Sequence, residues 1–223
     1  MLATIIKRIF DLLISLLVLM VSWPILIILG LLIYLEDRGS VFFVQQRLGK
    51  GGVPFNIIKF RSMILSAEKS GTGLYSYKDD PRITRVGNFI RKTSLDELPQ
   101  VFNVIRGEMS IVGPRPPVVY ELGPWQDYTP DMLERFKVKP GITGLAQISG
   151  RNENDWDAKI IFDNKYVFLY QKYNILIDIK ILFFTVGALF RSGDTIEPSV
   201  RGDDGPISRK ARIASEKYLN KKN

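Results

Sequence analysis

The 223-residue sequence contains no cysteine and no histidine. A cysteine nucleophile, a Ser-His-Asp triad and an imidazole base are therefore excluded. Ordinary zinc sites built from cysteine and histidine are excluded as well, and no disulfide can form. The chemistry that remains is that of carboxylates, Lys, Arg and hydroxyl groups, together with a hard metal ion such as Mg²⁺ bound through oxygen ligands.

The charge is unbalanced toward the basic side, with 31 Lys and Arg against 23 Asp and Glu and a net charge of +8. Such a chain suits an anionic membrane surface or a substrate that carries phosphate. The basic residues are dispersed and match no nucleic-acid-binding motif, so we expect no nucleic-acid partner. Hydrophobic residues make up 46% of the chain, which excludes a disordered tail.

One long apolar run lies near the N-terminus. Residues 12–35 contain no charged side chain, and as a straight helix they extend about 36 Å, more than a bilayer core of roughly 30 Å. Pro24 interrupts this helix, since it removes one backbone hydrogen bond and clashes with the preceding turn. The run is therefore either a kinked spanning helix or a re-entrant helix-break-helix that enters and leaves by one face.

The flanking charges favour the re-entrant form. Lys7 and Arg8 precede the run, and basic residues also dominate after it, so both ends are predicted to be cytoplasmic. The cations that follow are Arg38, Arg47, Lys50, Lys59 and Arg61. We therefore predict a monotopic hairpin over residues 1–36 with its break at Ser22 and Pro24. A cleaved signal peptide fits less well, because the run is too long for one and no A-x-A-like site follows it.

The remaining chain reads as a small α+β domain. Residues 41–45 and 55–60 are predicted to be two strands of a hairpin joined through Gly49–Gly52. Residues 155–173 have a helical pattern, and 175–190 is either a core helix or an amphipathic helix at the membrane interface. We divide the chain into the membrane segment 1–36, a domain over 37–190 and a polar tail over 191–223.

Asp155 and Asp157 form a D-x-D pattern. Such a pair can hold a divalent metal and a nucleotide diphosphate, but two acids at this spacing are common by chance. The pattern is weak, and a role as acids at a helix N-terminus explains the same residues better.

Asp96 and Glu97 are a stronger candidate pair. The run SLDE over 94–97 matches a capping box, in which Ser94 is the N-cap and Glu97 reaches back to it. The box does not explain Asp96. A carboxylate in the first turn of a helix stays ionised, and it can then attack phosphorus or bind Mg²⁺.

Cations surround these acids along the sequence. Lys59 and Arg61 follow a predicted strand, Arg82 precedes the acids, and Arg115 lies in the proline-rich turn over 113–117. Cations on rigid turns stabilise the charge of a transferring phosphoryl group. We take these four residues as candidate phosphate ligands.

Five ordered motifs resemble those of the bacterial sugar transferases, the monotopic phosphoglycosyl transferases, over nearly the whole chain. They are KFRSM at 59–63, DPRIT at 80–84, SLDELPQ at 94–100, SIVGPRP at 110–116 and KPGITGLAQ at 139–147. The resemblance implies an α/β, membrane-associated fold: a re-entrant hairpin followed by a small α+β cytosolic domain with interfacial helices and a short β-hairpin. One departure is that Trp23 separates Ser22 from Pro24, where the family often places Ser directly before the proline.

The resemblance also implies a reaction. A phosphosugar moves from a UDP-sugar to undecaprenyl phosphate, giving polyprenyl-diphosphate-sugar and UMP in a ping-pong mechanism that requires Mg²⁺. Asp96 would attack the β-phosphorus and hold the phosphosugar covalently, and Glu97 would support the metal or the geometry of the acid pair. Lys59 and Arg115 would hold phosphate oxygens. The expected location is the cytoplasmic face of the bacterial inner membrane, at the first membrane step of glycoconjugate assembly.

Two other functions remain open at this point. One is a membrane glycosyltransferase that releases UDP and binds its metal through Asp155 and Asp157. The other is a non-enzymatic, basic scaffold anchored to membrane phospholipid. The sequence identifies neither the sugar nor the oligomeric state, and a homo-oligomer stays open.

Overall fold

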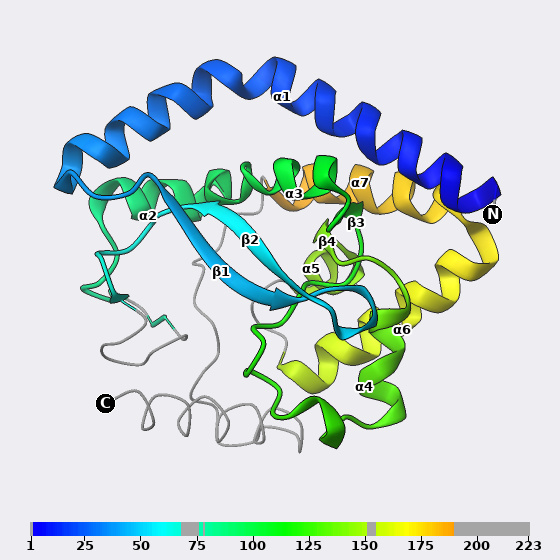
Figure 1. Ribbon diagram of the computed structural model, residues 1–223. Helices are drawn as coiled ribbons and strands as arrows, with labels where there is room; N and C mark the ends of the chain where they lie inside the picture. Colours follow the sequence, from blue (N-terminus) through cyan, green and yellow to red (C-terminus); the bar gives the residue numbers. More distant parts are fainter. Residues whose placement is uncertain (1, 68–75, 78, 151–154, 190–223) are drawn as a thin grey trace.

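The computed structural model describes residues 2–67, 76–77, 79–150 and 155–189. The predicted tail over 191–223 lies outside the described residues, as does most of the segment 69–80. The described part is rich in helix, with an apolar N-terminal helix and a small α+β body that contains a short antiparallel hairpin (Figure 1).

Helix α1 spans Leu2–Asp37 and runs unbroken through Pro24. By length and composition it is the one helix of the described residues that could cross a membrane. It arches over the body, with its middle farthest away and both ends returning to the same side (Figure 1). Pro24 cannot donate to the carbonyl of Met20, which is a sufficient cause for bending. The Ser22 hydroxyl is buried at this bend and has no hydrogen-bond partner among the described residues. The re-entrant topology itself stays a prediction.

Polar side chains fasten the N-terminal part of α1 to the body. The buried Asp11 carboxylate accepts hydrogen bonds from Ser110 Oγ (3.0 Å) and Ile111 N (3.1 Å). Lys7 Nζ lies 3.1 Å from Asp11 Oδ1 and 2.9 Å from Asp178 Oδ2. Arg8 donates to the last carbonyls of a short helix, at 2.5 Å and 2.7 Å. The two cations that precede the apolar run are therefore engaged within the protein.

The hairpin is formed by β1 (Phe42–Leu48) and β2 (Pro54–Phe60), joined by the 3-10 turn η1 (Lys50–Gly52). The strands are antiparallel and pair Phe42 with Phe60, whose rings stack with centroids 5.5 Å apart. The hairpin is confirmed, although β1 continues beyond the predicted 41–45. Gly51 has a φ of 67°, a conformation that L-residues with side chains seldom adopt.

The rest of the body consists of short elements followed by two longer helices. In chain order they are α2 (Arg85–Lys92), η3 (Leu95–Glu97), α3 (Gln100–Arg106), β3 (Ser110–Val112), η4 (Trp125–Asp127), α4 (Pro130–Glu134), η5 (Arg135–Lys137), β4 (Gly141–Thr143), α5 (Leu145–Gly150), α6 (Trp156–Tyr173) and α7 (Ile175–Leu189). Strands β3 and β4 pair in parallel. The predicted helix over 155–173 is thus confirmed as α6.

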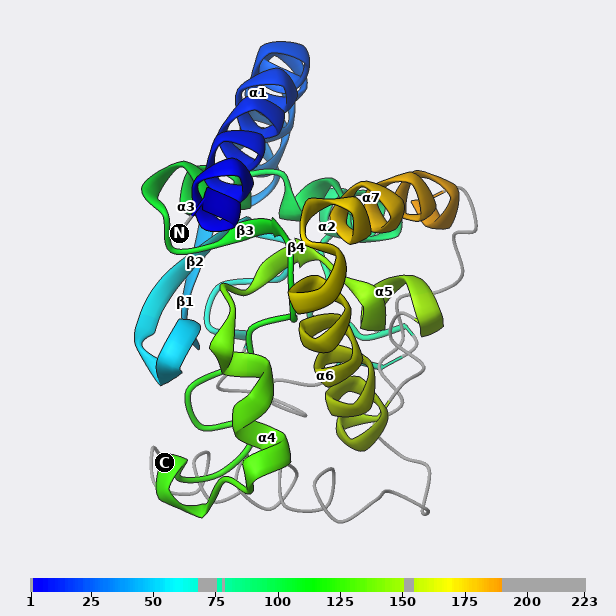
Figure 2. The same ribbon diagram turned by 90° about the vertical axis from the view of Figure 1, so that its right-hand side faces the viewer.

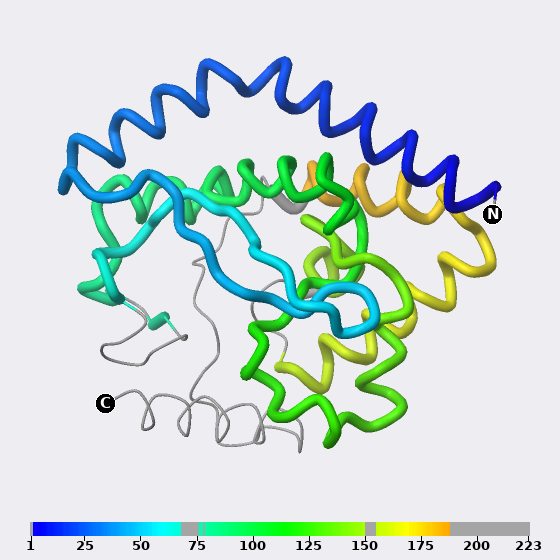
Figure 3. The backbone as a smooth tube through the Cα atoms, in the orientation of Figure 1, coloured from blue at the N-terminus to red at the C-terminus, as the bar shows by residue number. Residues whose placement is uncertain are grey.

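The elements are arranged in layers. Helices α2, α3 and α7 lie in a row beneath α1 (Figure 1), and α6 descends from α7 toward α4 (Figure 2). Figure 3 shows the hairpin running below this row. The main core includes Val104, Met109, Val112 and Val167, all nearly inaccessible to solvent. This core fixes the ends of the short elements, where the candidate site residues lie.

Candidate functional site

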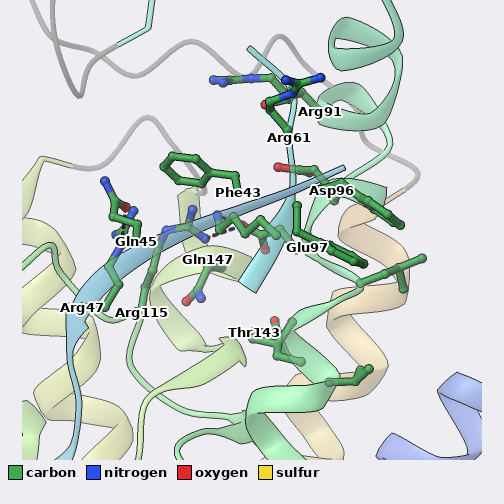
Figure 4. A pocket seen from close by; sticks show the side chains of 18 of the residues that line it. Phe43, Gln45, Arg47, Arg61, Arg91, Asp96, Glu97, Arg115, Thr143 and Gln147 are labelled. Atoms are coloured by element: carbon green, nitrogen blue, oxygen red, sulfur yellow. Dashed lines mark hydrogen bonds and ion pairs between the residues drawn. The ribbon is translucent and has the colours of Figure 1, made fainter. Parts of the chain in front are cut away.

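A cavity of about 600 Å³ opens between the hairpin, η3 and α5. Lys59 reaches the cavity from β2. Asp96 and Glu97 reach it from η3, and Arg115 reaches it from the loop after β3 (Figure 4). These four residues are separated by up to 56 positions in the sequence and meet around one space. The cavity also extends to the underside of α1, where Ile14 and Val18 line it.

The two acids of the pair have different surroundings. Glu97 Oε1 is bound by Lys59 Nζ and by Arg115 Nη1, each at 2.9 Å. Asp96, half-buried one position earlier, receives no hydrogen bond or ion pair from any side chain in the described part of the chain. One carboxylate is therefore neutralised by two cations, while the other faces the cavity without a direct partner.

Electrostatics separate the two acids in the same way. Burial raises the pKa of Asp96 to about 6, against the opposing effect of Lys59 and with a further contribution from the charge of Glu97. Burial acts on Glu97 too, but Arg115 and Lys59 outweigh it and hold the pKa of Glu97 well below its usual range. The pKa of Lys59 is lowered, chiefly by burial. At neutral pH both carboxylates are thus ionised, and Asp96 is the more basic.

The capping box predicted over 94–97 is wrong. Ser94 adopts a left-handed conformation with a φ of 57° and makes no capping hydrogen bond through its side chain. The segment forms the single 3-10 turn η3, and α3 begins only at Gln100 after Pro99. Glu97 instead reaches two distant cations, because an ion pair in a half-buried site stabilises the carboxylate more than one backbone amide does.

The other predicted cations are placed differently. Arg61 lines the cavity and pairs with Asp37 at the end of α1. Arg82 forms a buried ion pair with Asp80, at 2.6 Å, and is not among the described residues that line the cavity. Arg91, from α2, lies beside Asp96 in the cavity wall (Figure 4) and its Nη2 donates to Ser76 Oγ at 2.6 Å. The structure thus brings Arg61 to the acids and leaves Arg82 apart from them.

The D-x-D pair lies at the start of α6. Asp155 is the N-cap of this helix, and its Oδ1 accepts from Ala158 N at 2.8 Å. Neither Asp155 nor Asp157 is among the described residues that line the cavity. The helix-capping explanation of Asp155 is therefore confirmed.

The sequence argument missed the far wall of the cavity. Arg135 from η5 and Asp163 from α6 form an ion pair there at 2.8 Å, and both side chains are 1% exposed. Burial raises the pKa of Asp163 to about 6, against the effect of Arg135. The one available signal was a charge at position 163 within the apolar pattern of a helix, which ordinarily faces solvent.

The acid pair suits Mg²⁺ in its chemistry. This ion is usually bound by one or two carboxylates together with substrate phosphates and water. Asp96 offers an unpaired carboxylate at the cavity, whereas Glu97 is already engaged by two cations. No group of three or more acidic side chains that could hold a metal by itself occurs within the described residues. A bound ion would therefore depend on Asp96 and on oxygens of the substrate.

The sequence profile of the family described as "Bacterial sugar transferase" matches residues 2–192. The chain belongs to the bacterial sugar transferase family. The chain is 42% identical over 199 residues to the undecaprenyl-phosphate galactose phosphotransferase of Salmonella typhimurium, covering 83% of this chain and 40% of the relative. It is 41% identical over 199 residues to the UDP-galactose-lipid carrier transferase of Erwinia amylovora, with the same coverage.

A shorter relative matches over most of its own length. The exopolysaccharide production protein ExoY of Sinorhizobium fredii is 41% identical over 197 residues, covering 82% of this chain and 84% of that protein. The chain thus spans about two fifths of the length of the first two relatives and most of the third.

Proposed function

We propose that the protein transfers a phosphosugar from a UDP-sugar to undecaprenyl phosphate. The observation that carries this proposal is the Asp96 carboxylate, which faces a cavity lined by cations and has no ion pair with any described residue. The family match and the names of the relatives, which act on undecaprenyl phosphate or a lipid carrier, support the same reaction class.

In the first half-reaction an Asp96 oxygen attacks the β-phosphorus of the UDP-sugar. The bond from that phosphorus to the bridging oxygen breaks, and UMP leaves with the bonding electrons. The phosphosugar remains on Asp96 as an acyl phosphate. In the second half-reaction a phosphate oxygen of the lipid attacks the same phosphorus, which releases the polyprenyl-diphosphate-sugar and restores the carboxylate.

The neighbouring groups assist without a proton transfer. Lys59 and Arg115 hold phosphate oxygens and stabilise the charge that develops on the leaving UMP. Glu97 keeps both cations in place through its 2.9 Å contacts. Mg²⁺ would be held by the Asp96 carboxylate and by oxygens of the substrate, while Glu97 keeps its two cations, and it would supply further neutralisation of the diphosphate.

We also propose that the chain lies on the cytoplasmic face of the bacterial inner membrane. Much of α1 exposes large apolar side chains, and so does the row of helices beneath it. On α2, α3 and α7 these are Phe89, Phe102, Leu176, Ile179 and Phe183. Exposed apolar surface of this extent is typical of proteins that contact a bilayer. A monotopic hairpin with interfacial helices accounts for it.

The test is to identify the released nucleotide. Purified protein in nanodiscs is given Mg²⁺, undecaprenyl phosphate and a panel of UDP-sugars, with Asp96→Asn and Asp157→Asn in parallel. The expected result is UMP from at least one sugar, abolished by Asp96→Asn and unaffected by Asp157→Asn. Release of UDP that depends on Asp157 would instead establish a glycosyltransferase, and no turnover with any sugar would favour a membrane-anchored scaffold.

A further inference from the structure

The loop that carries Arg115 has an unusual backbone. Residues 113–117 read Gly-Pro-Arg-Pro-Pro, so three of the five positions have no amide hydrogen. Such a loop cannot be held by donating hydrogen bonds from these positions. Gly113 N donates to Thr143 O at 2.9 Å where the loop begins, and beyond this residue the backbone is attached through its carbonyl groups.

Every carbonyl from residue 114 to residue 117 accepts a hydrogen bond, and the four donors come from the three elements β4, η5 and β1. The donors, in the order of the carbonyls, are Gly141 N (2.9 Å), Arg135 Nη2, Arg47 Nη1 (2.9 Å) and Leu48 N (2.9 Å). Two of these donors are backbone amides, and two are guanidinium groups. The carbonyl of Arg115 itself is bound by Arg135.

The Arg135 guanidinium is held by contacts on several sides. Its guanidinium pairs with Asp163 at 2.8 Å and lies 5.1 Å from the ring centre of Trp156 and 5.6 Å from that of Phe136. A guanidinium with its rotamer fixed in this way is a rigid anchor. With 1% of its side chain exposed, Arg135 acts on its neighbours within the protein.

We infer that Arg135, fixed by Asp163, is a positioning residue for Arg115. By binding the Arg115 carbonyl it sets where the Arg115 guanidinium meets Glu97 and the substrate diphosphate, and Arg47 provides a second anchor one residue later. The inference rests on the proposed function, because it assigns Arg115 to the substrate. A displacement of about 1 Å at such a group can cost on the order of 10²-fold in rate.

The test uses a variant that removes the anchor while keeping the fold. Arg135→Met alone leaves Asp163 buried and unpaired, which destabilises the protein. The combined change Arg135→Met with Asp163→Leu replaces both charges by apolar groups of similar size, which is often neutral or stabilising. Lys137→Met is the matched control, because Lys137 lies in the same 3-10 helix with 61% of its side chain exposed.

The readout is kcat/KM for UMP release from the accepted UDP-sugar in nanodiscs, together with the unfolding midpoint. Removal of the Arg135–Asp163 pair is expected to lower kcat/KM by about tenfold or more. Arg115→Met is expected to lower it by about 10²-fold, the usual effect of losing one electrostatic contact to a transition state. The variant with all three changes should be no more than about threefold below Arg115→Met, since one group acting through another is not additive.

Arg47→Met is an independent second test. It should lower kcat/KM by less than removal of the Arg135–Asp163 pair does, and it should cause no further loss when Arg115→Met is already present. Effects that multiply in the combined variants would overturn the inference, since Arg135 would then act independently of Arg115. Unchanged kinetics after removal of the Arg135–Asp163 pair would overturn it as well. If the unsubstituted protein releases no UMP, the proposed function itself is refuted. This outcome is distinct from the kinetic results that would refute only the positioning role of Arg135.

Discussion

Two neighbouring acids differ because each has different partners. Glu97 accepts contacts from two cations, and Asp96 accepts none from the described side chains. The pKa of Glu97 is therefore lowered and that of Asp96 is raised. One site thus holds an anion fixed by cations and a more basic carboxylate, the proposed nucleophile.

The first prediction concerns pH. In the proposed reaction Asp96 attacks only when it is ionised, and burial raises its pKa to about 6. The rate constant of the first UMP burst should therefore rise with pH through about 6 and level off above it, and below that point it should fall about tenfold per pH unit. Rapid-quench measurements between pH 5 and pH 8 check this. A burst rate constant that does not change between pH 5 and pH 8 would show that the rate does not depend on ionisation of Asp96.

A second prediction uses the residues around Asp96. The charge of Glu97 raises the pKa of Asp96, and that of Lys59 lowers it. Glu97→Gln should thus move the midpoint of the pH profile downward, and Lys59→Met should move it upward, whatever each does to the maximal rate. Lys137→Met, distant from the acids, should leave the midpoint unchanged. Shifts of the same sign in both variants would contradict the electrostatic assignment.

The participants in this site were predictable, but their contacts were not. Asp96, Lys59 and Arg115 follow from motif and chemistry. The partners of Glu97 could not be predicted in this way. The capping-box pattern assigned Glu97 to Ser94, whereas its actual partners, Lys59 and Arg115, lie 38 and 18 positions away. Arg135 was missed for the same reason: nothing near it in the sequence indicates that Asp163 neutralises it.

Among the elements, α6 offers a direct test of the alternative function. Asp155 caps this helix through its 2.8 Å contact with Ala158 N. Asp155→Ala should lower the free energy of unfolding by about 1 kcal/mol, with UMP release unchanged at temperatures below unfolding. Asp155→Ser, which retains a capping oxygen, is the control. If the folded Asp155→Ala variant lost UMP release, the D-x-D pair would take part in the reaction.

Helix α1 is attached to the body through a buried carboxylate, which gives a fourth prediction. Asp11 accepts hydrogen bonds from Ser110 and from the amide of Ile111 and also pairs with Lys7. Asp11→Ala leaves the Ile111 amide without its acceptor, whereas Ser110 Oγ still donates to Val112 O and Lys7 still pairs with Asp178. The stability should therefore fall by about 2 kcal/mol. Thermal unfolding in detergent measures it. Leu13→Ala, at a side chain 62% exposed, should change little.

Element boundaries show where sequence patterns reach their limit. The hairpin and α6 follow their periodicity, and each is confirmed. Leu95, Leu98 and Phe102 also recur at helical spacing, yet the chain forms η3 and then α3 with Pro99 between them. Pro99 has no amide hydrogen, and the hydrogen bonds around it have 3-10 spacing, from Leu98 N to Leu95 O and from Val101 N to Leu98 O. The turn that presents Asp96 is therefore separate from α3.

At the scale of the whole molecule, the topology of α1 can be tested because the chain has no cysteine. Thr4→Cys and Ser40→Cys place single exposed thiols near the two ends of the helix. A re-entrant hairpin predicts that an impermeant maleimide labels both in inverted vesicles and neither in spheroplasts. Lys50→Cys, in the exposed hairpin turn, marks the cytosolic side. Labelling of one end from each side would establish a spanning helix.

The cavity reaches from Asp96 to Ile14 and Val18 on the underside of α1. In the proposed reaction the lipid phosphate therefore meets the acyl phosphate without leaving the bilayer, and the search for the acceptor takes place in two dimensions. The second half-reaction then depends on the mole fraction of acceptor within the membrane, whereas the first depends on the concentration of sugar nucleotide in water. Diluting the acceptor with inert phospholipid should therefore slow the second half-reaction. Diluting the vesicles with buffer lowers the concentration of sugar nucleotide and should slow only the first.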